Sequence, residues 1–248
     1  MQRHKRENIE WLNFDLLSEV LEFSHGVLLR VGGYSASSYR SLNGSYDVGD
    51  DPENVTKNRD KVCALFGLSS LIFARQCHGV EVVPVVEHSL DLPPCDGLMT
   101  NRAKCALAVL HADCQSAIFL DPKRRAFAVL HSGWRGSVSN IYGEAILRLE
   151  STYGCKREDI LACIGPSLGP AEYADWRSLF PQKLWHFRKE GDIFDFWEIS
   201  HFQLTQAGIL PHHIEIAKMD TFENCADFFS YRRDHTTGRH ITFASLMH

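Results

Sequence analysis

Two short runs of the sequence combine side chains that bind metal ions or act as nucleophiles with residues that bind anions. The first run is His111-Ala-Asp113-Cys114, and the second is His131-Ser-Gly133-Trp134-Arg135-Gly136. The second run has the pattern of a strand, a glycine-bracketed turn and a helix start, where free backbone N–H groups and Arg135 could hold a phosphate. The sequence therefore predicts a metal or cysteine centre beside an anion site.

A β-hairpin must bring the two runs together. Residues 115–120 and 126–131 are short apolar segments joined by a polar turn that contains Pro122. A turn centred on the next residue pairs Gln115 with His131, with opposed Cβ atoms about 4.5–5.5 Å apart. We therefore expect Cys114, one residue further on, to share one end of the hairpin with His131.

The surrounding elements form a mixed α/β pattern without repeats or linkers, which indicates a single domain over residues 1–248. Residues 32–52 are rich in Gly, Ser, Asn and Asp, and we expect a long structured loop of the kind that often carries function. The expected strands are 81–86, 105–110, 115–120, 126–131, 160–164 and 239–244, and the expected helices are 55–66, 137–149 and 196–207.

A metal site built on Cys114 and His131 needs a third ligand. The run Gln76-Cys-His78-Gly79 places a histidine in a loop before a predicted strand. Two histidines and one cysteine are a zinc set that leaves the fourth position open for water or substrate. By spacing alone, however, His78 is no better a candidate than the other loop or strand-end histidines, which are His25, His88 and His111.

Three other functions can be weighed from the same residues. Cys114 could be the nucleophile of a cysteine hydrolase, activated by His131. A multi-copper oxidase is disfavoured, because such sites use His-x-His pairs and no two histidines here are two residues apart. Gly165-Pro-Ser167-Leu-Gly169 matches the serine hydrolase elbow, but its prolines oppose the helix that must follow. An aromatic and basic cluster at residues 228–234 could clamp a nucleotide.

Composition and charge limit the partners. The 248 residues carry a net charge of −5, so an acidic balance opposes nucleic-acid binding. We expect no signal peptide and no membrane span, hence a cytoplasmic protein, and a monomer or homodimer. The eight cysteines contain no C-x-x-C pair, so neither a zinc finger nor a redox motif is indicated.

Taken together and in order, the motifs resemble those of the YfiH-like family, long labelled multicopper polyphenol oxidase or laccase-domain proteins. The resemblance spans nearly the whole chain, although Leu28-Leu29, Ala171-Glu172 and Asp220 depart from the usual pattern. The matching segments are Arg30-x-Gly-Gly-x-Ser35, Tyr39-x-Ser-Leu-Asn43, Gly49–Pro52, Asn58-Arg59, Gln76-x-His-Gly79, Asp96–Thr100, Ala112-Asp-Cys114, His131-x-Gly-Trp-Arg-Gly136, Ile164–Pro170 and Ser230-x-Arg-Arg233.

This resemblance implies an α+β fold in which mixed β-sheets pack between outer helices as a four-layer sandwich. It also implies zinc, held by His78, Cys114 and His131. Copper is the less favoured metal because the sequence contains no His-x-His pair. The family is understood to phosphorolyse adenosine, inosine, guanosine and methylthioadenosine, and to deaminate adenosine. We therefore expect a purine nucleoside phosphorylase in which Cys114, His131 and Asp113 are catalytic. The residues expected to bind substrate and phosphate are Arg30, Asn43, Arg135 and Arg232.

Overall fold

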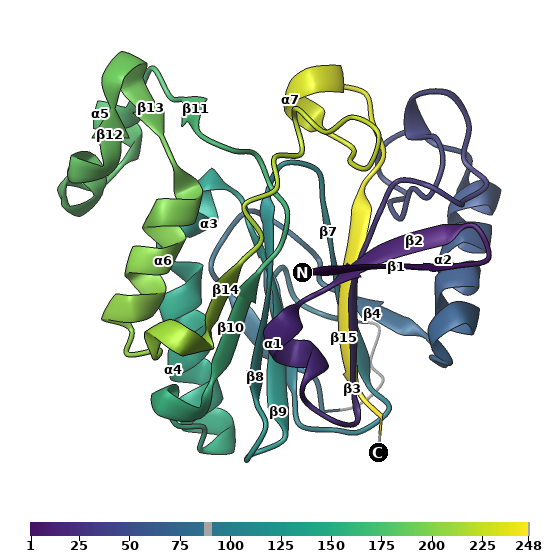
Figure 1. Ribbon diagram of the computed structural model, residues 1–248, viewed down its shortest axis with the longest axis horizontal. Helices are drawn as coiled ribbons and strands as arrows, with labels where there is room; N and C mark the ends of the chain where they lie inside the picture. Colours follow the sequence, from purple (N-terminus) through teal and green to yellow (C-terminus); the bar gives the residue numbers. More distant parts are fainter. Residues whose placement is uncertain (87–90, 248) are drawn as a thin grey trace.

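The chain folds into four layers, with two six-stranded sheets face to face and helices outside each sheet. The computed structural model describes residues 1–86 and 91–247. Helices α4 (Ile141–Tyr153) and α6 (Phe196–Gln206) cover one sheet, and α2 (Pro52–Phe66) covers the other (Figure 1). The predicted α+β sandwich of mixed sheets between outer helices is confirmed.

The first sheet contains both ends of the chain, and the second contains the predicted hairpin. The first has the order β1-β2-β3-β15-β7-β4, the second β14-β10-β8-β9-β6-β5, and a small third sheet β11-β13-β12. The first sheet comprises β1 (Gln2–Arg6), β2 (Ile9–Asn13), β3 (Phe23–Leu28), β15 (His240–Leu246), β7 (Ala106–His111) and β4 (Leu71–Phe73). The second comprises β14 (Ile214–Ile216), β10 (Leu161–Ile164), β8 (Gln115–Asp121), β9 (Ala126–Ser132), β6 (Gly97–Thr100) and β5 (Val82–Pro84).

The remaining elements are short. The third sheet consists of β11 (Ala171–Glu172), β13 (Ile193–Phe194) and β12 (Arg188–Lys189). The other α-helices are α1 (Asp15–Ser18), α3 (Trp134–Val138), α5 (Trp176–Leu179) and α7 (Tyr231–Asp234). Short 3₁₀-helices occur at Ser37–Tyr39, Arg157–Asp159, Gln182–Phe187, Glu190–Asp192 and Pro211–His213. Among the described residues, no helix is long and apolar enough to cross a membrane.

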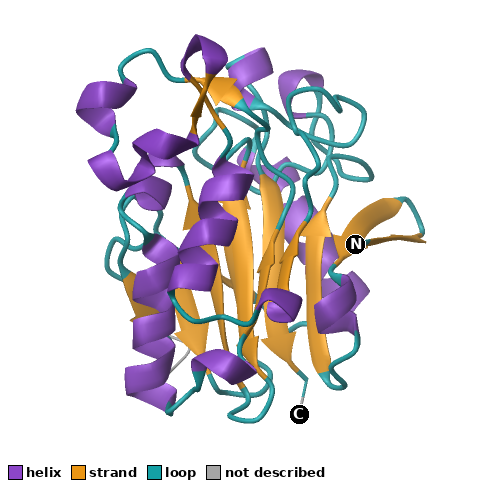
Figure 2. Cartoon of the chain, turned by 60° about the vertical axis from the view of Figure 1, so that its left-hand side comes forward, coloured by secondary structure: helices purple, strands orange, loops and turns teal. Residues whose placement is uncertain are grey.

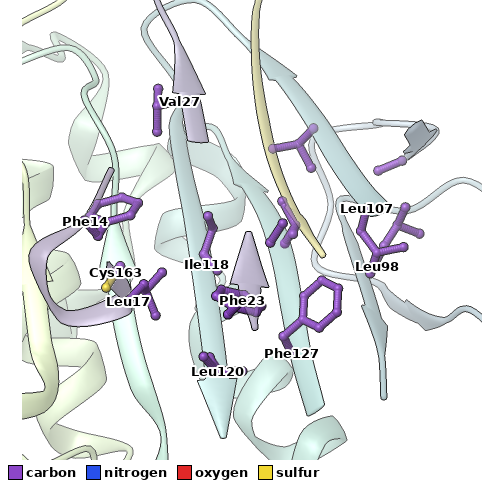
Figure 3. Packing of buried hydrophobic residues seen from close by; sticks show 14 of the residues in the cluster. Phe14, Leu17, Phe23, Val27, Leu98, Leu107, Ile118, Leu120, Phe127 and Cys163 are labelled. Atoms are coloured by element: carbon purple, nitrogen blue, oxygen red, sulfur yellow. The ribbon is translucent and has the colours of Figure 1, made fainter. Parts of the chain in front are cut away.

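The main hydrophobic core lies between the two large sheets. Val27 and Leu107 of the first sheet and Ile118, Leu120 and Phe127 of the second are fully buried there or nearly so (Figure 3). Alternate residues of β8 and β9 face the outer helices and pack on α4 and α6. Because both faces of these strands are buried, they form continuous apolar runs in the sequence.

The hairpin of β8 and β9 forms as predicted, but its register differs by one residue. Gln115 pairs with Ser132, and Ser116 pairs with His131. The expected pairing of Gln115 with His131 is wrong because the turn contains four residues, 122–125, between the closing pair of β8 and β9. The Asp121 side chain stabilises this turn by accepting hydrogen bonds from two of its backbone N–H groups.

The register decides whether the site can exist. Side chains alternate between the faces of a strand, so a slip of one residue moves a side chain to the opposite face. In the observed register Cys114 and His131 lie on the same face, diagonal neighbours across the hairpin end. Had Gln115 paired with His131, Cys114 would have pointed to the other face of the sheet.

The predicted helix over residues 137–149 is in fact two helices. α3 ends at Val138 and α4 begins at Ile141, with Asn140 between them in the left-handed region at φ 65°. The Asn140 side chain accepts a hydrogen bond from the N–H of Gly143 and so caps α4. Continuous apolar periodicity concealed this break, although an asparagine at a helix start was a visible signal.

One end of the sandwich gathers the loops. Helix α7 and the third sheet lie at this end, beyond the ends of the long strands (Figures 1 and 2). His131, next to last in β9, shares a strand face with Phe127 and Val129, whose side chains pack between the two sheets. The fold therefore places the residues predicted to bind a metal or act as a nucleophile beneath these loops.

Candidate metal centre and its two pockets

Three of the predicted residues meet at one end of the second sheet. The ligand atoms of His78, Cys114 and His131 all lie within 4.8 Å of one another. His131 comes from β9, Cys114 directly precedes β8, and His78 lies in the loop between β4 and β5. Among residues 1–86 and 91–247 these three form the one group of its kind that could hold a metal ion. His78, one of several equal candidates by spacing, is the histidine that the fold brings in.

A glycine makes room for this ligand set. A Cβ atom on Gly133, which follows β9, would lie 3.0 Å from Cδ2 of His78 and 3.2 Å from Sγ of Cys114. Both separations are shorter than ordinary carbon and sulfur contacts, so a larger residue would push the ligands apart. The glycine of the turn thus serves the ligand set, in addition to beginning α3.

A residue absent from the predicted site, Asp96, fixes two of the candidate ligands. Its fully buried carboxylate lies 2.8 Å from Nδ1 of His131. It also accepts hydrogen bonds from the backbone N–H groups of Cys77, His78 and Gly79, at 2.6–3.1 Å. Its backbone oxygen accepts a further bond from the N–H of His131. One carboxylate therefore ties the His78 loop to β9.

The protonation of Asp96 determines which nitrogen of His131 is available. Burial raises the pKa of the Asp96 carboxyl, but hydrogen bonds from His131 and from the Gly79 N–H lower it to about 2. An ionised carboxylate can only accept, so Nδ1 of His131 carries the hydrogen and Nε2 is left to face the ligand set. Carboxylates commonly orient metal-binding histidines in this way.

The Cys114 and His131 side chains shift each other's protonation. Burial raises the pKa of the Cys114 thiol, but the charge and hydrogen bonds of His131 and His78 lower it to about 6. Burial lowers the pKa of His131, but Cys114 and Asp96 raise it to about 9. Without metal, the pair is therefore a thiolate and an imidazolium at neutral pH, and thiolate is the form that binds metal ions.

Two pockets of different chemistry adjoin at the ligand set. The first, here called the arginine pocket, has a volume of about 580 Å³ and includes Asp47, Arg75 and Arg239 besides the three ligands. The second, here called the aromatic pocket, has a volume of about 230 Å³. Its lining includes Asp113, Cys114, Ser132, Trp134, Ser137, Tyr173, Phe196, Tyr231 and Arg232. Ala112, Cys114 and Tyr231 line both pockets.

Two further predicted residues border the site. Asp113, in the left-handed region at φ 81°, accepts hydrogen bonds from the Thr221 hydroxyl and from the backbone N–H of Arg232. Both Asp113 and Arg232 line the aromatic pocket. Asp113 therefore anchors the first turn of α7, which carries Tyr231, next to Cys114.

The other predicted substrate residues are not among those lining either pocket. The Arg30 guanidinium donates to the backbone oxygens of Arg40, Cys225 and Phe228. Asn43 is fully buried, and its amide binds Ser45, Asp50 and the backbone N–H of Arg239. Arg135 lies over the ring of its neighbour Trp134.

Of the other histidines considered as the third metal ligand, two have hydrogen-bond partners elsewhere in the fold. His25 accepts a hydrogen bond from the N–H of Phe14, within the first sheet's core. His111 is bonded to Thr242 of β15. His88 lies outside the described residues. Ser167, of the serine hydrolase motif, is fully buried and accepts a hydrogen bond from the Trp197 indole, so no nucleophile elbow forms.

Sequence reasoning missed Asp96, Arg239 and two aromatic residues of the pocket, Tyr173 and Phe196. Tyr231 and Arg232, which also line it, belong to the aromatic and basic cluster at residues 228–234 that the sequence offered as a nucleotide clamp. Asp96 had a usable signal, because a metal-binding histidine usually has a carboxylate partner and Asp96 stands in a matching family segment. Arg239 and Tyr173 had none, since only the tertiary fold brings residues so distant in sequence to the hairpin end.

Comparisons with known proteins agree over nearly the whole chain. A family model described as multi-copper polyphenol oxidoreductase laccase matches residues 24–247. The chain is 30% identical to a purine nucleoside phosphorylase of Bacteroides thetaiotaomicron over 246 residues, covering 90% of both proteins. It is 30% identical to the purine nucleoside phosphorylase YfiH of Escherichia coli, covering 88% of this chain and 91% of YfiH. It superposes on YlmD from Geobacillus stearothermophilus with a TM-score of 0.87 at 26% identity, covering 99% and 98% of the two chains.

Proposed function

Because this chain belongs to the multi-copper polyphenol oxidoreductase laccase family, whose relatives named above are purine nucleoside phosphorylases, we propose that it is a zinc-dependent purine nucleoside phosphorylase. Its proposed substrates are adenosine, inosine, guanosine and methylthioadenosine, each with phosphate. Deamination of adenosine, in which water replaces the 6-amino group and ammonia leaves, is proposed as a second activity of the same site.

The observation that carries this proposal is the convergence of His78, Cys114 and His131 between two pockets. Two imidazole nitrogens and one thiolate are a donor set that suits zinc and leaves a coordination position open. The space beside Gly133 and the orientation of His131 by Asp96 both fit such an ion. When bound, zinc would supply Lewis acidity at the junction of the pockets.

The arginine pocket suits phosphate. Arg239 and Arg75 line it. The Arg239 guanidinium uses Nη1 to donate to the backbone oxygens of Thr237 and Gly238, and its remaining N–H groups are proposed to face the anion. Guanidinium groups bind phosphate through paired, charge-assisted hydrogen bonds. We propose Arg239 and Arg75 as phosphate contacts, and Arg135, on the exposed side of the turn, as a second candidate.

The other predicted residues have proposed roles that follow from their contacts. Arg232 lies at the rim of the aromatic pocket, where it could contact substrate. Arg30 and Asn43 use their polar groups on the protein, so we propose that they position the loops, and Asn43 in particular the backbone of Arg239. Asp113 acts on the reaction by holding α7 over the junction.

In phosphorolysis, a phosphate oxygen forms a bond to C1′ of the ribose while the bond from C1′ to the base nitrogen breaks. The base leaves with the electron pair and takes up a proton, and the products are free base and ribose 1-phosphate. The phosphate approaches C1′ on one side, and the base departs on the opposite side. Two adjoining pockets of different chemistry therefore suit this reaction, with the ribose at their junction.

A second candidate is a cysteine hydrolase, favoured by the thiolate and imidazolium character of Cys114 and His131. A copper-dependent polyphenol oxidase is the third, favoured by the family's description alone. The donor set is a single three-ligand group among the described residues, whereas multi-copper chemistry needs several clustered metals.

The test is metal analysis of protein purified without added metal, combined with an assay of adenosine plus phosphate for adenine and ribose 1-phosphate. The proposal expects about one zinc per chain and phosphate-dependent release of base. Release of base without phosphate would contradict phosphorolysis, and full turnover by metal-free protein would favour the hydrolase. His131→Ala is expected to lose the metal, whereas Arg135→Ala is expected to keep it.

A further inference from the structure

We propose that the aromatic pocket binds the purine base, and that the hydroxyl groups of Ser132 and Ser137 recognise the substituent at position 6 of the ring. This inference rests on the proposed phosphorylase function and assigns the base to one of the two pockets. It also explains how one site can accept both 6-amino and 6-oxo purines.

Four aromatic side chains line this pocket and are available to stack on a planar ring. Trp134, Tyr173, Phe196 and Tyr231 all line it. Tyr173 packs edge-on against Phe196 with ring centroids 5.3 Å apart, so neither ring is free to collapse into the pocket. Tyr231 is 53% exposed and stands on α7, which Asp113 anchors beside Cys114. Aromatic faces stack on any nucleobase and tolerate differences in its substituents.

The floor of the pocket is polar and almost fully buried. Ser132 and Ser137 are 2% and 1% exposed, and their hydroxyl oxygens lie 2.9 Å apart. Either hydroxyl can be the donor in this pair. The side-chain oxygen Oε1 of Gln115, beside them, already accepts hydrogen bonds from the Tyr142 and Ser200 hydroxyls, so it is not available to a ligand. The serine pair is therefore the adaptable part of the floor.

A hydroxyl pair can serve two kinds of base. A serine hydroxyl can donate to the 6-oxo group of inosine or guanosine, and by rotating it can accept from the 6-amino group of adenosine. An amide or a charged group at the same place would favour one of them. The floor thus predicts broad purine specificity with a penalty for a ring that lacks any substituent at position 6.

The charged residues of the two pockets argue against placing the base in the arginine pocket and phosphate in the aromatic pocket. The arginine pocket presents two guanidinium groups and the Asp47 carboxylate, which suit an anion and the ribose hydroxyls. The aromatic pocket is the smaller of the two and carries its one arginine, Arg232, near the Tyr173 ring at 6.0 Å. Phosphate in the arginine pocket and base in the aromatic pocket place C1′ at Cys114, which both pockets share.

The first test removes a wall of the aromatic pocket. Tyr231→Ala is expected to raise KM for adenosine and inosine by about tenfold at unchanged zinc content. Calorimetric binding of free hypoxanthine should weaken by a similar factor. Tyr34→Ala is the matched control, because Tyr34 is also 53% exposed but lies in another loop, and it should change neither quantity.

The second test removes the floor. Wild-type protein is expected to bind purine riboside, which has no substituent at position 6, about fivefold more weakly than inosine, the loss of one hydrogen bond. The double variant Ser132→Ala/Ser137→Ala should lose this preference. Tyr231→Ala should retain the preference for inosine, because stacking on an aromatic ring does not depend on the substituent at position 6.

The outcomes separate this inference from the function on which it rests. Absence of phosphate-dependent turnover in wild-type protein would refute the phosphorylase. An active wild type whose preference for inosine over purine riboside survives in the double serine variant would refute the floor. An active wild type with unchanged nucleoside KM and hypoxanthine affinity in Tyr231→Ala would overturn the assignment of the base to this pocket.

Discussion

Replacing Asp96 by asparagine should weaken zinc binding without changing any of the three proposed ligands. One carboxylate oxygen accepts from Nδ1 of His131 and from the N–H of His78, and the other accepts from the N–H groups of Cys77 and Gly79. An amide offers one accepting oxygen and one donating NH₂ group. In either orientation, the NH₂ group therefore replaces a carboxylate oxygen that accepted two hydrogen bonds, and it faces two N–H donors.

Both orientations of the new amide harm metal binding. If its oxygen faces His131, the NH₂ group opposes two backbone N–H groups and displaces the loop that carries His78. If its NH₂ group faces His131, it donates to Nδ1, which moves the hydrogen of the imidazole to Nε2. A protonated Nε2 has no lone pair for a metal ion, so His131 cannot be a ligand in that form.

The expected magnitude is a 10- to 100-fold loss of zinc affinity, or about 1.4–2.8 kcal/mol, as is typical when the partner of a metal-binding histidine is removed. The assay is competition for zinc with a chromophoric chelator. Asp121→Asn is the matched control, because Asp121 is equally buried and accepts from the backbone N–H groups of Lys123 and Arg124 at the other end of the hairpin. Asp121→Asn should lower thermal stability but retain zinc affinity. Equal zinc affinity in Asp96→Asn and wild type would refute the reasoning.

Three further predictions concern the same site. Gly133→Ala should weaken zinc binding by about tenfold with a small loss of thermal stability, because its methyl group would press on His78 and Cys114; unchanged chelator competition would contradict this. In metal-free Cys77→Ser protein, alkylation of Cys114 should stay fast at pH 7 and slow as the pH falls through about 6, since the depressed thiol pKa keeps the thiolate present above that pH. Zinc should block the alkylation, and a rate that rises only near pH 9 would show an ordinary thiol. Arg239→Gln should raise KM for phosphate roughly tenfold to a hundredfold at constant zinc content, and an unchanged value would remove Arg239 from the phosphate site.

The sequence predicted the framework of the fold because its strands and motifs are locally encoded. The apolar runs of β8 and β9 and the polar turn between them located the hairpin, and the match of ordered motifs indicated the sandwich. Register was a different matter, because it depended on whether the turn held an odd or an even number of residues. That detail, set by the hydrogen bonds of Asp121, decides which face Cys114 occupies.

The site was predicted in part for a related reason. Cys114 and His131 lie near each other through one hairpin, so local reasoning could pair them, whereas His78 required either the family resemblance or the fold. Asp96 and Arg239 reach the site through β6 and β15, whose neighbours are distant in sequence. Arg30 and Asn43 were predicted to bind substrate or phosphate, but their polar groups form hydrogen bonds to the backbone of the protein instead.

The most direct test of the account is a zinc titration of phosphorolysis. Protein stripped of metal is mixed with inosine and phosphate, zinc is added in steps up to one equivalent per chain, and ribose 1-phosphate is measured. The account predicts negligible product before zinc, a linear rise that ends at one equivalent, and no restoration in Cys114→Ser. Full formation of ribose 1-phosphate by the stripped protein would contradict the zinc centre, and release of hypoxanthine without ribose 1-phosphate would contradict phosphorolysis.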